Sequence, residues 1–135
     1  MPLIVWTEEY SVNIREIDNQ HKRWFAILNK LFDAKGSNQE TGILSDILTE
    51  LMEYAKIHFA TEEKYFKAYG YPDADSHVKE HEAFIKKVGD FKQSFERSKT
   101  GLDVSVLNYL LNWLKNHIQG SDRAYGPYLN EKGVR

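Results

Sequence analysis

The chain contains five histidines, and each of them continues the apolar stripe of a predicted helix. They are His21, His58, His77, His81 and His117. Imidazole can bind a transition metal or transfer a proton. A single histidine on an apolar stripe is more often an ordinary core residue than a ligand. Five of them, distributed over four predicted segments, instead indicate one shared site.

A carboxylate lies on the same kind of stripe. Glu62 follows His58 by four residues in HFATE, and His81 follows His77 by four in HVKEH. Residues four apart share a helix face, so each pair directs two ligand atoms the same way. A buried carboxylate must be protonated, paired or bound to metal, and no lysine or arginine lies on the neighbouring stripes. Either pair alone occurs by chance in many helical proteins, but together they predict a metal site in the core.

The segment NHIQGSD separates His117 from Asp122 by five residues. On a regular helix a step of four turns two side chains about 40° apart, whereas a step of five turns them about 140° apart. Asp122 can therefore join His117 only if the helix widens by a residue, as in a π-bulge, or ends and turns back near Gly120. Without the other ligands, Asp122 would be interpreted as a surface residue that caps the following segment.

These seven residues supply enough donor atoms for two metal ions. If both carboxylates bridge, they supply four oxygen contacts. Together with five nitrogens this makes nine contacts, more than one ion can use. Two octahedral ions with an oxo or hydroxo bridge would keep one position open. This donor set suits non-haem iron, although imidazole also suits zinc, copper and nickel. Iron gives the open position a purpose, because two ferrous ions together can give two electrons to dioxygen.

The elements that must position these residues are four amphipathic helical segments with no convincing strand between them. The first begins near Asp18, a suitable N-cap, and the second spans about 40 to 69. Glycine and proline mark three breaks, at KGSNQ (35 to 39), GYPDADS (70 to 76) and KTGLD (99 to 103). The pattern predicts an all-α, antiparallel, up-down-up-down four-helix bundle with an irregular N-terminal arm.

Composition excludes several other classes of function. The chain has 135 residues, 18 basic and 20 acidic side chains and no cysteine, so it has no thiolate site and no disulfide. A net charge of -2 without long runs of like charge does not favour nucleic acid as a partner. No apolar stretch approaches the length of a membrane span, and the start lacks a signal-peptide pattern. We expect a cytoplasmic protein that does not insert into membranes and is a monomer, because its outer helix faces are polar.

Five short motifs together distinguish this chain. They are DNQH ending at His21, HFATEE at 58 to 63, HVKEH at 77 to 81, WLKNHIQGSD at 113 to 122 and YGPYL at 125 to 129. With them the chain resembles the hemerythrin family, and more closely its single-domain bacterial branch. The resemblance covers nearly the whole chain and implies one domain over 1 to 135, with an arm over 1 to 16 and a bundle over 17 to 131.

The resemblance also implies a division of the ligands between two irons. His77, His81 and His117 would bind one iron, His21 and His58 the other, and Glu62 and Asp122 would bridge them. The second iron would be the five-coordinate one that takes dioxygen as its ligand. A dry pocket over this iron would be formed by Phe59, Trp113, Leu114 and Ile118, with Trp24 as a further wall.

The implied function is reversible dioxygen binding for storage, delivery or sensing, without catalysis. One alternative is a di-iron oxidase or peroxidase, but such bundles use more carboxylates, whereas here histidines outnumber carboxylates five to two. Another is a module that senses oxygen, iron or nitric oxide. Sensing or delivery would require an oxygen-recipient or signalling protein that is separate from this chain. A bundle without metal would leave Glu62 unexplained.

Overall fold

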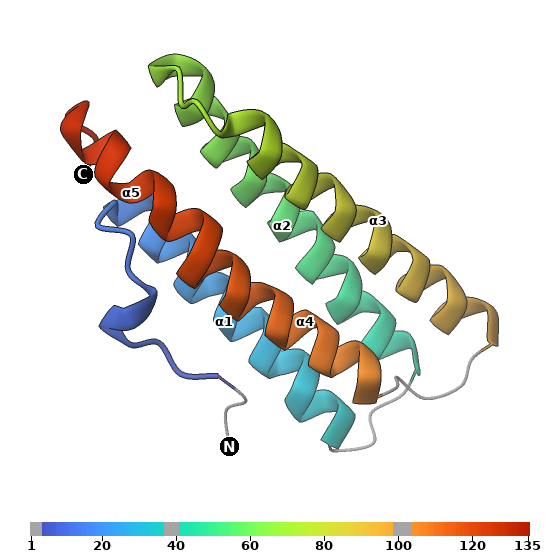
Figure 1. The fold of residues 1–135 in the computed structure, drawn as a ribbon. Helices are drawn as coiled ribbons and strands as arrows, with labels where there is room; N and C mark the ends of the chain where they lie inside the picture. The colour runs from blue at the N-terminus through green and yellow to red at the C-terminus, as the bar shows by residue number, and fades with distance from the viewer. Residues whose placement is uncertain (1–3, 37–40, 99–103) are drawn as a thin grey trace.

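The computed structural model describes residues 4–36, 41–98 and 104–135, and four long helical stretches dominate it (Figure 1). Three are continuous: α1 (Arg15–Gly36), α2 (Thr41–Tyr69) and α3 (Ala74–Ser98). The fourth consists of α4 (Val104–Asn116), the π-helical turn η2 (His117–Asp122) and α5 (Arg123–Glu131). The helices lie side by side with alternating direction, so the predicted antiparallel four-helix bundle is confirmed.

Two apolar clusters fill the bundle, and the predicted ligands separate them along each helix. On α2, Ala55 and Phe59 belong to the larger cluster and Phe66 to the smaller one. On the fourth helix Leu114 belongs to the larger cluster and Tyr125 to the smaller. His58 and Glu62 lie between Ala55 and Phe66, and His117 and Asp122 lie between Leu114 and Tyr125. They therefore form a polar layer enclosed between two apolar ones.

The turn from α2 to α3 packs into the smaller apolar cluster. Gly70 has a φ of +63°, which favours glycine, and the Tyr71 N–H donates to the Phe66 carbonyl at 3.1 Å. This hydrogen bond is characteristic of the Schellman motif. The Phe66 and Tyr71 rings make the apolar contact that usually accompanies it, with 5.0 Å between the ring centroids. The break predicted at 70 to 76 is present but shorter, because α3 already begins at Ala74. The break at 99 to 103, and residues 37–39 of the first break, lie outside the described residues.

The predicted start of the first helix was wrong by one turn. The helix begins at Arg15, and Asp18 lies inside its first turn. The Asp18 carboxylate accepts hydrogen bonds from the Val12 N–H at 2.8 Å and the Ser11 hydroxyl at 2.6 Å. Asp18 therefore anchors the N-terminal arm instead of capping the helix, a role that the capping preference of aspartate does not distinguish.

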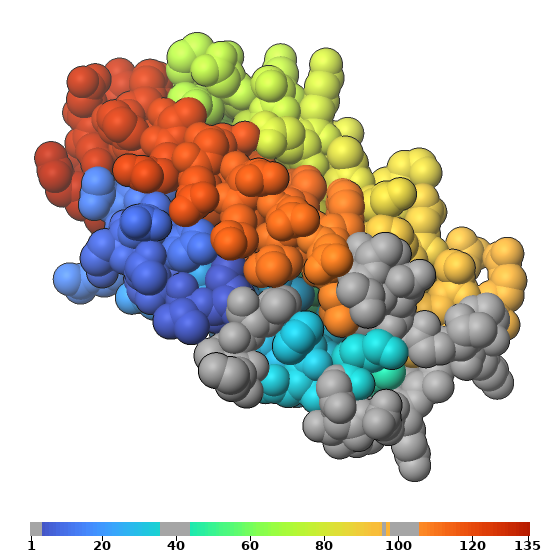
Figure 2. All heavy atoms as spheres, turned by 60° about the horizontal axis from the view of Figure 1, so that its bottom comes forward, coloured from blue at the N-terminus to red at the C-terminus, as the bar shows by residue number. Residues whose placement is uncertain are grey.

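The N-terminal arm is held along the bundle by specific contacts. The Asn29 side chain donates to the Ile4 carbonyl and accepts from the Ile4 N–H, at 2.8 and 2.9 Å. Gly126 lies so close to the Val12 carbonyl that a Cβ there would be 2.8 Å from its oxygen. Figure 2 shows the arm (blue) lying against the C-terminal segment (red). Among the described residues, no helix combines the length and apolar character of a membrane span.

Candidate metal centre

The π-helical turn brings His117 and Asp122 to the same side of the fourth helix. The Arg123 N–H that follows it donates to the Ile118 carbonyl, five residues earlier, as well as to that of Gly120. Hydrogen bonds over five residues widen the helix, so side chains five apart come into register. The sequence left open whether the helix widens or ends near Gly120. The structure shows that it widens and then continues as α5.

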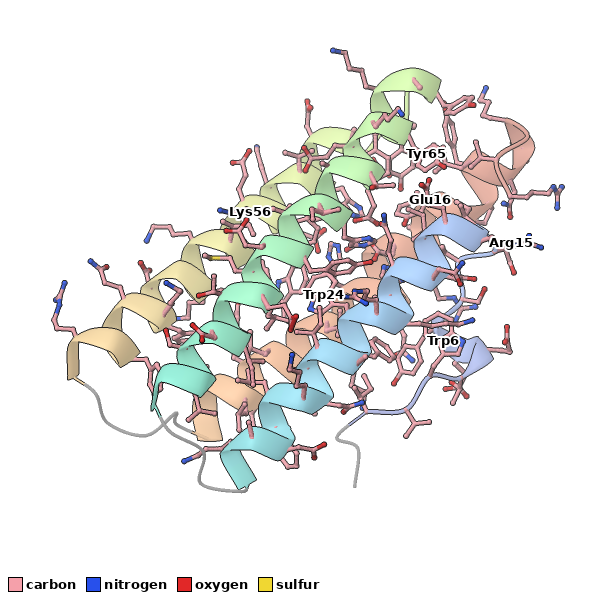
Figure 3. All side chains as sticks on the ribbon, turned by 180° about the vertical axis from the view of Figure 1, so that it is seen from behind. Trp6, Arg15, Glu16, Trp24, Lys56 and Tyr65 are labelled. Carbon is pink, nitrogen blue, oxygen red and sulfur yellow. The ribbon has the colours of Figure 1, made fainter. Side chains whose placement is uncertain are left out.

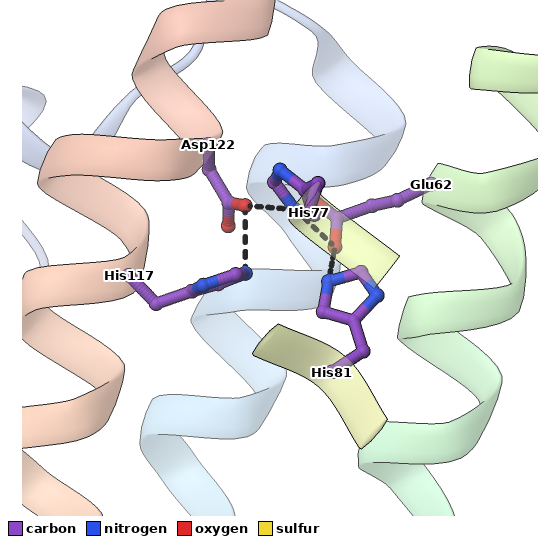
Figure 4. Close-up of side chains that lie close together, drawn as sticks. All are labelled: Glu62, His77, His81, His117 and Asp122. Carbon is purple, nitrogen blue, oxygen red and sulfur yellow. Dashed lines mark ion pairs between the residues drawn. The ribbon is translucent and has the colours of Figure 1, made fainter. Parts of the chain in front are cut away.

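All seven predicted ligands lie together in the core, and none is more than 3% exposed. Their donor atoms form two groups, and within each group these atoms lie within 4.8 Å of one another. One group contains Glu62, His77, His81, His117 and Asp122 (Figure 4). The other contains His21, His58, Glu62 and Asp122. Both carboxylates belong to both groups, so they lie where bridging ligands would be required.

Asp122 directs one carboxylate oxygen to each group. Its Oδ2 is 3.0 Å from Nε2 of His21. Its Oδ1 is 3.0 Å from Nε2 of His77 and also 3.0 Å from Nε2 of His117. The five-residue step in the helix therefore gives this carboxylate access to both sets of imidazoles.

Glu62 reaches both groups with a single oxygen. Its Oε1 is 3.3 Å from Nε2 of His58 and 3.1 Å from Nε2 of His81. Its Oε2 accepts a hydrogen bond of 2.5 Å from the buried hydroxyl of Tyr125. Tyr125 had no role in the sequence prediction, and its position in YGPYL, three residues after Asp122, was the only available signal.

The donor atoms at the centre have few partners of their own. Oε1 of Glu62, both oxygens of Asp122 and Nε2 of His77, His81 and His117 are buried without a well-formed hydrogen bond. Native proteins rarely bury such atoms unsatisfied, because each costs the free energy of its lost hydration. Here three imidazole nitrogens of the larger group meet the carboxylate oxygens that both groups share, and no thiolate is among them. In the smaller group, Nε2 of His21 lies 3.0 Å from Nε2 of His58. The residues therefore fit two metal ions that favour nitrogen and oxygen ligands.

The carboxylates are negatively charged despite their burial. Burial alone would raise their pKa values, but the surrounding imidazoles outweigh it and hold the pKa of Glu62 well below its usual value, and that of Asp122 low as well. Burial likewise opposes charge on His77 and His117, yet the carboxylates raise the pKa of His77 to about 9 and that of His117 to about 10. Burial and neighbouring His58 lower the pKa of His21. In the protein without metal, the imidazoles of His77 and His117 therefore keep their protons near neutral pH, at the place where a cation would bind.

Hydrogen bonds from the outer ring nitrogens orient three of the imidazoles. Nδ1 of His81 lies 3.0 Å from a Glu63 oxygen, and Nδ1 of His117 lies 3.1 Å from a Glu80 oxygen that also accepts from Ser121. In the smaller group, Nδ1 of His58 instead lies 2.6 Å from the neutral amide oxygen of Gln20. Such partners fix the ring and its tautomer. Sequence reasoning missed all of them, since nothing in their spacing separates them from other surface polar residues.

The predicted pocket residues surround the centre on the side of the larger apolar cluster. Trp24, Phe59, Leu114 and Ile118 are buried, and Trp113 is half-buried. The Phe59 ring stacks on the His81 ring with 3.7 Å between the ring centroids, and the Trp113 ring stacks on the His117 ring with 4.3 Å between them. Trp24 points into the bundle (Figure 3) and meets His58 edge-on at 5.6 Å. The three aromatic residues therefore pack directly on candidate ligands, and Leu114 and Ile118 belong to the same apolar cluster.

Comparisons with known proteins agree with this geometry. Residues 12–129 match the hemerythrin HHE cation binding domain. A bacteriohemerythrin of Stenotrophomonas maltophilia is 37% identical over 93% of this chain and 80% of its own length, and one of Clostridium acetobutylicum is 34% identical over 91% and 98%. A crystal structure of wild-type hemerythrin matches with a TM-score of 0.87 at 30% identity, covering 93% of this chain and 96% of that one.

Proposed function

The chain belongs to the hemerythrin family, and on this premise we propose that it binds dioxygen reversibly at a non-haem di-iron centre. Oxygen binding is the function of the family. The observation that carries the proposal is the convergence of seven buried histidines and carboxylates in two groups that share both carboxylates, three of whose four oxygens are unsatisfied.

Each ligand has a role that follows from its place in these groups. His77, His81 and His117 would hold one iron, and His21 and His58 the other. Glu62 and Asp122 would bridge the two ions. The group with two histidines offers fewer donors, so its iron would be the one able to take dioxygen as a further ligand.

Bound iron would supply the electrons that hold dioxygen, and the chain's own residues would keep that exchange reversible. The aromatic and aliphatic side chains over the centre exclude water and provide no acid or base beside it. Among the residues that the structure describes, Tyr125 carries the one hydroxyl bonded to a proposed bridging carboxylate, and its pKa is raised well above the usual value by burial and by the charge of Glu62. It therefore stays protonated and acts as a fixed hydrogen-bond donor.

We further propose that the protein is not an enzyme. The family is generally oxygen-binding, and di-iron enzymes built in helical bundles rely on more carboxylates than the two at this centre. Neutral imidazoles add no negative charge to the metal ions, which favours binding of dioxygen over its further activation.

Iron analysis combined with an oxygen electrode tests this function. The reduced protein should contain two irons per chain, one for each donor group, take up one dioxygen, and release it when the gas phase is exchanged for nitrogen. Continuous consumption of dioxygen in the presence of a reductant would contradict the proposal and favour an oxidase or peroxidase.

A further inference from the structure

The candidate ligands are so deeply buried that an incoming metal ion must cross the protein to reach them. A small depression of about 170 Å³ leads from the surface to His77. It lies between the first turns of α3 on one side and η2 and the start of α5 on the other. These two segments, yellow-green and red, lie side by side in Figure 2. Asp73, Ser76 and Glu80 line it from the α3 side and Ser121 from the other, and His77 forms part of its wall.

This depression reaches the group with three histidines. His77 is only 3% exposed, and its Nε2 makes no well-formed hydrogen bond. Glu80 extends from the depression to the Nδ1 of His117, at 3.1 Å. Two of the side chains that line the depression, His77 and Glu80, thus belong to the centre or contact it directly.

The charge of the lining suits a cation. Asp73 and Glu80 contribute negative charge, and the described residues that line the depression include no lysine or arginine. Its volume is several times the ~30 Å³ that one water molecule occupies in the liquid, so a partly hydrated ion has room. Hydroxyl and carboxylate oxygens are suitable replacements for the water that the ion must lose.

A second depression reaches a candidate ligand but has the opposite character. It lies between α2 and α3, where Phe59 and Ile85 form an apolar lining beside His81. Lys56 and Lys86 flank it and offset the charge of its acidic residues. Stripping water from a divalent cation on an apolar surface is costly, and the lysines would repel it.

We propose that the acidic depression beside His77 is the entrance through which Fe²⁺ reaches the centre. The inference rests on the proposed metal-binding function and adds its route of loading. Since a path serves both directions, removing charge at the entrance slows loading and release alike and leaves the equilibrium affinity unchanged. A residue that merely supports the bound ions would behave differently, because its loss would speed release.

The test measures both rates on the full-length protein. Release is followed from the reduced, iron-loaded protein under nitrogen into a ferrous chelator that absorbs visible light, and loading is followed after Fe²⁺ is added back. Asp73→Asn is the first variant, because asparagine keeps the capping ability of aspartate next to the start of α3. Glu82→Gln, an equal change of charge at the lysine-flanked depression, is the control.

A second pair of variants tests the route by size. Ala124 is exposed and lines the acidic depression, so Ala124→Phe narrows it, whereas Ala83→Phe adds the same bulk at an exposed position on α3. We expect Asp73→Asn to slow loading on the order of fivefold, with a smaller effect at high salt. Ala124→Phe should slow loading and release, while both controls match the parent.

Equal rates in all five proteins, each with full iron content, would overturn the proposed entrance and leave the metal centre intact. Faster release from Asp73→Asn would also overturn it. A parent protein that takes up no iron would overturn the entrance and the proposed function together.

Discussion

Tyr125 donates a 2.5 Å hydrogen bond to Glu62 in a part of the core where both side chains are fully buried. The bond connects the fourth helix to α2 across the polar layer. It also occupies the Glu62 oxygen that faces away from the imidazoles, which leaves Oε1 to face both groups. The hydroxyl of Tyr125 therefore fixes the orientation of a proposed bridging ligand.

Tyr125→Phe should weaken the centre without disturbing the packing, since only the hydroxyl is lost. A buried carboxylate that loses its donor costs about 1–3 kcal/mol, so the unfolding free energy should fall by that amount. Iron release to a chelator should become faster. Tyr128→Phe is the matched control, because the Tyr128 hydroxyl bonds to the Tyr69 carbonyl outside the centre. If both variants release iron at the parent rate, Tyr125 does not position Glu62.

Glu63→Gln should lower iron affinity indirectly, because it leaves the ligand His81 in place but removes the carboxylate that orients its ring. The Glu63 carboxylate lies beside Nδ1 of His81 and holds its tautomer, and loss of such partners typically costs about 10- to 100-fold in metal affinity. Competition with a chelator of known affinity measures the change. Glu53→Gln, on an exposed part of α2, should retain the parent affinity.

Leu114→Ala should accelerate irreversible oxidation of the iron-loaded protein in air. Leu114 is fully buried one turn before His117, and a cavity there would admit water to the proposed dioxygen pocket. The truncation should also cost about 2–5 kcal/mol of unfolding free energy. Leu48→Ala removes an equally buried side chain of the same cluster on α2, and it should destabilise the fold without faster oxidation. Equal oxidation rates in the parent and in Leu114→Ala would refute the pocket.

The protein without metal should lose stability as pH rises from about 6.5 toward 10. The folded-state pKa values of His77 and His117, about 9 and about 10, lie above the usual 6.5. Their contribution is therefore complete below pH 6.5 and disappears as each imidazole loses its proton in the folded state. Thermal unfolding after chelation, recorded between pH 6 and 10, measures this dependence.

The stabilisation by iron should have the opposite pH dependence, because iron binds neutral imidazoles and competes with their protons. The increase in melting temperature on iron loading should grow as pH rises over the same range. A stabilisation that is independent of pH would show that the metal does not displace protons from His77 and His117.

The fold and the ligand cluster could be predicted from sequence because both depend on helical periodicity. His58 with Glu62, and His77 with His81, repeat at the helix step, so their shared faces follow from spacing alone. The position of Asp122 does not follow from helical periodicity alone. Its spacing from His117 required a departure from regular helix, but whether the backbone widens or turns depends on tertiary packing, which spacing does not encode.

The outer contacts could not be predicted, and the reason is geometric. Gln20, Glu63 and Glu80 each meet a ring from another helix, and the residues of each pair lie 18 to 38 positions apart in the chain. No local periodicity encodes such a pairing. The start of α1 was misplaced for a related reason, because the carboxylate of Asp18 binds the arm and not the end of its own helix.

The visible absorption spectrum tests the central claim most directly. The iron-loaded protein is reduced under nitrogen, exposed to air and returned to nitrogen, with a spectrum recorded at each step. We predict a colourless reduced protein that gains an absorption band in air and loses it under nitrogen over repeated cycles. A band that persists under nitrogen, or a protein that holds no iron, would contradict reversible dioxygen binding at this centre.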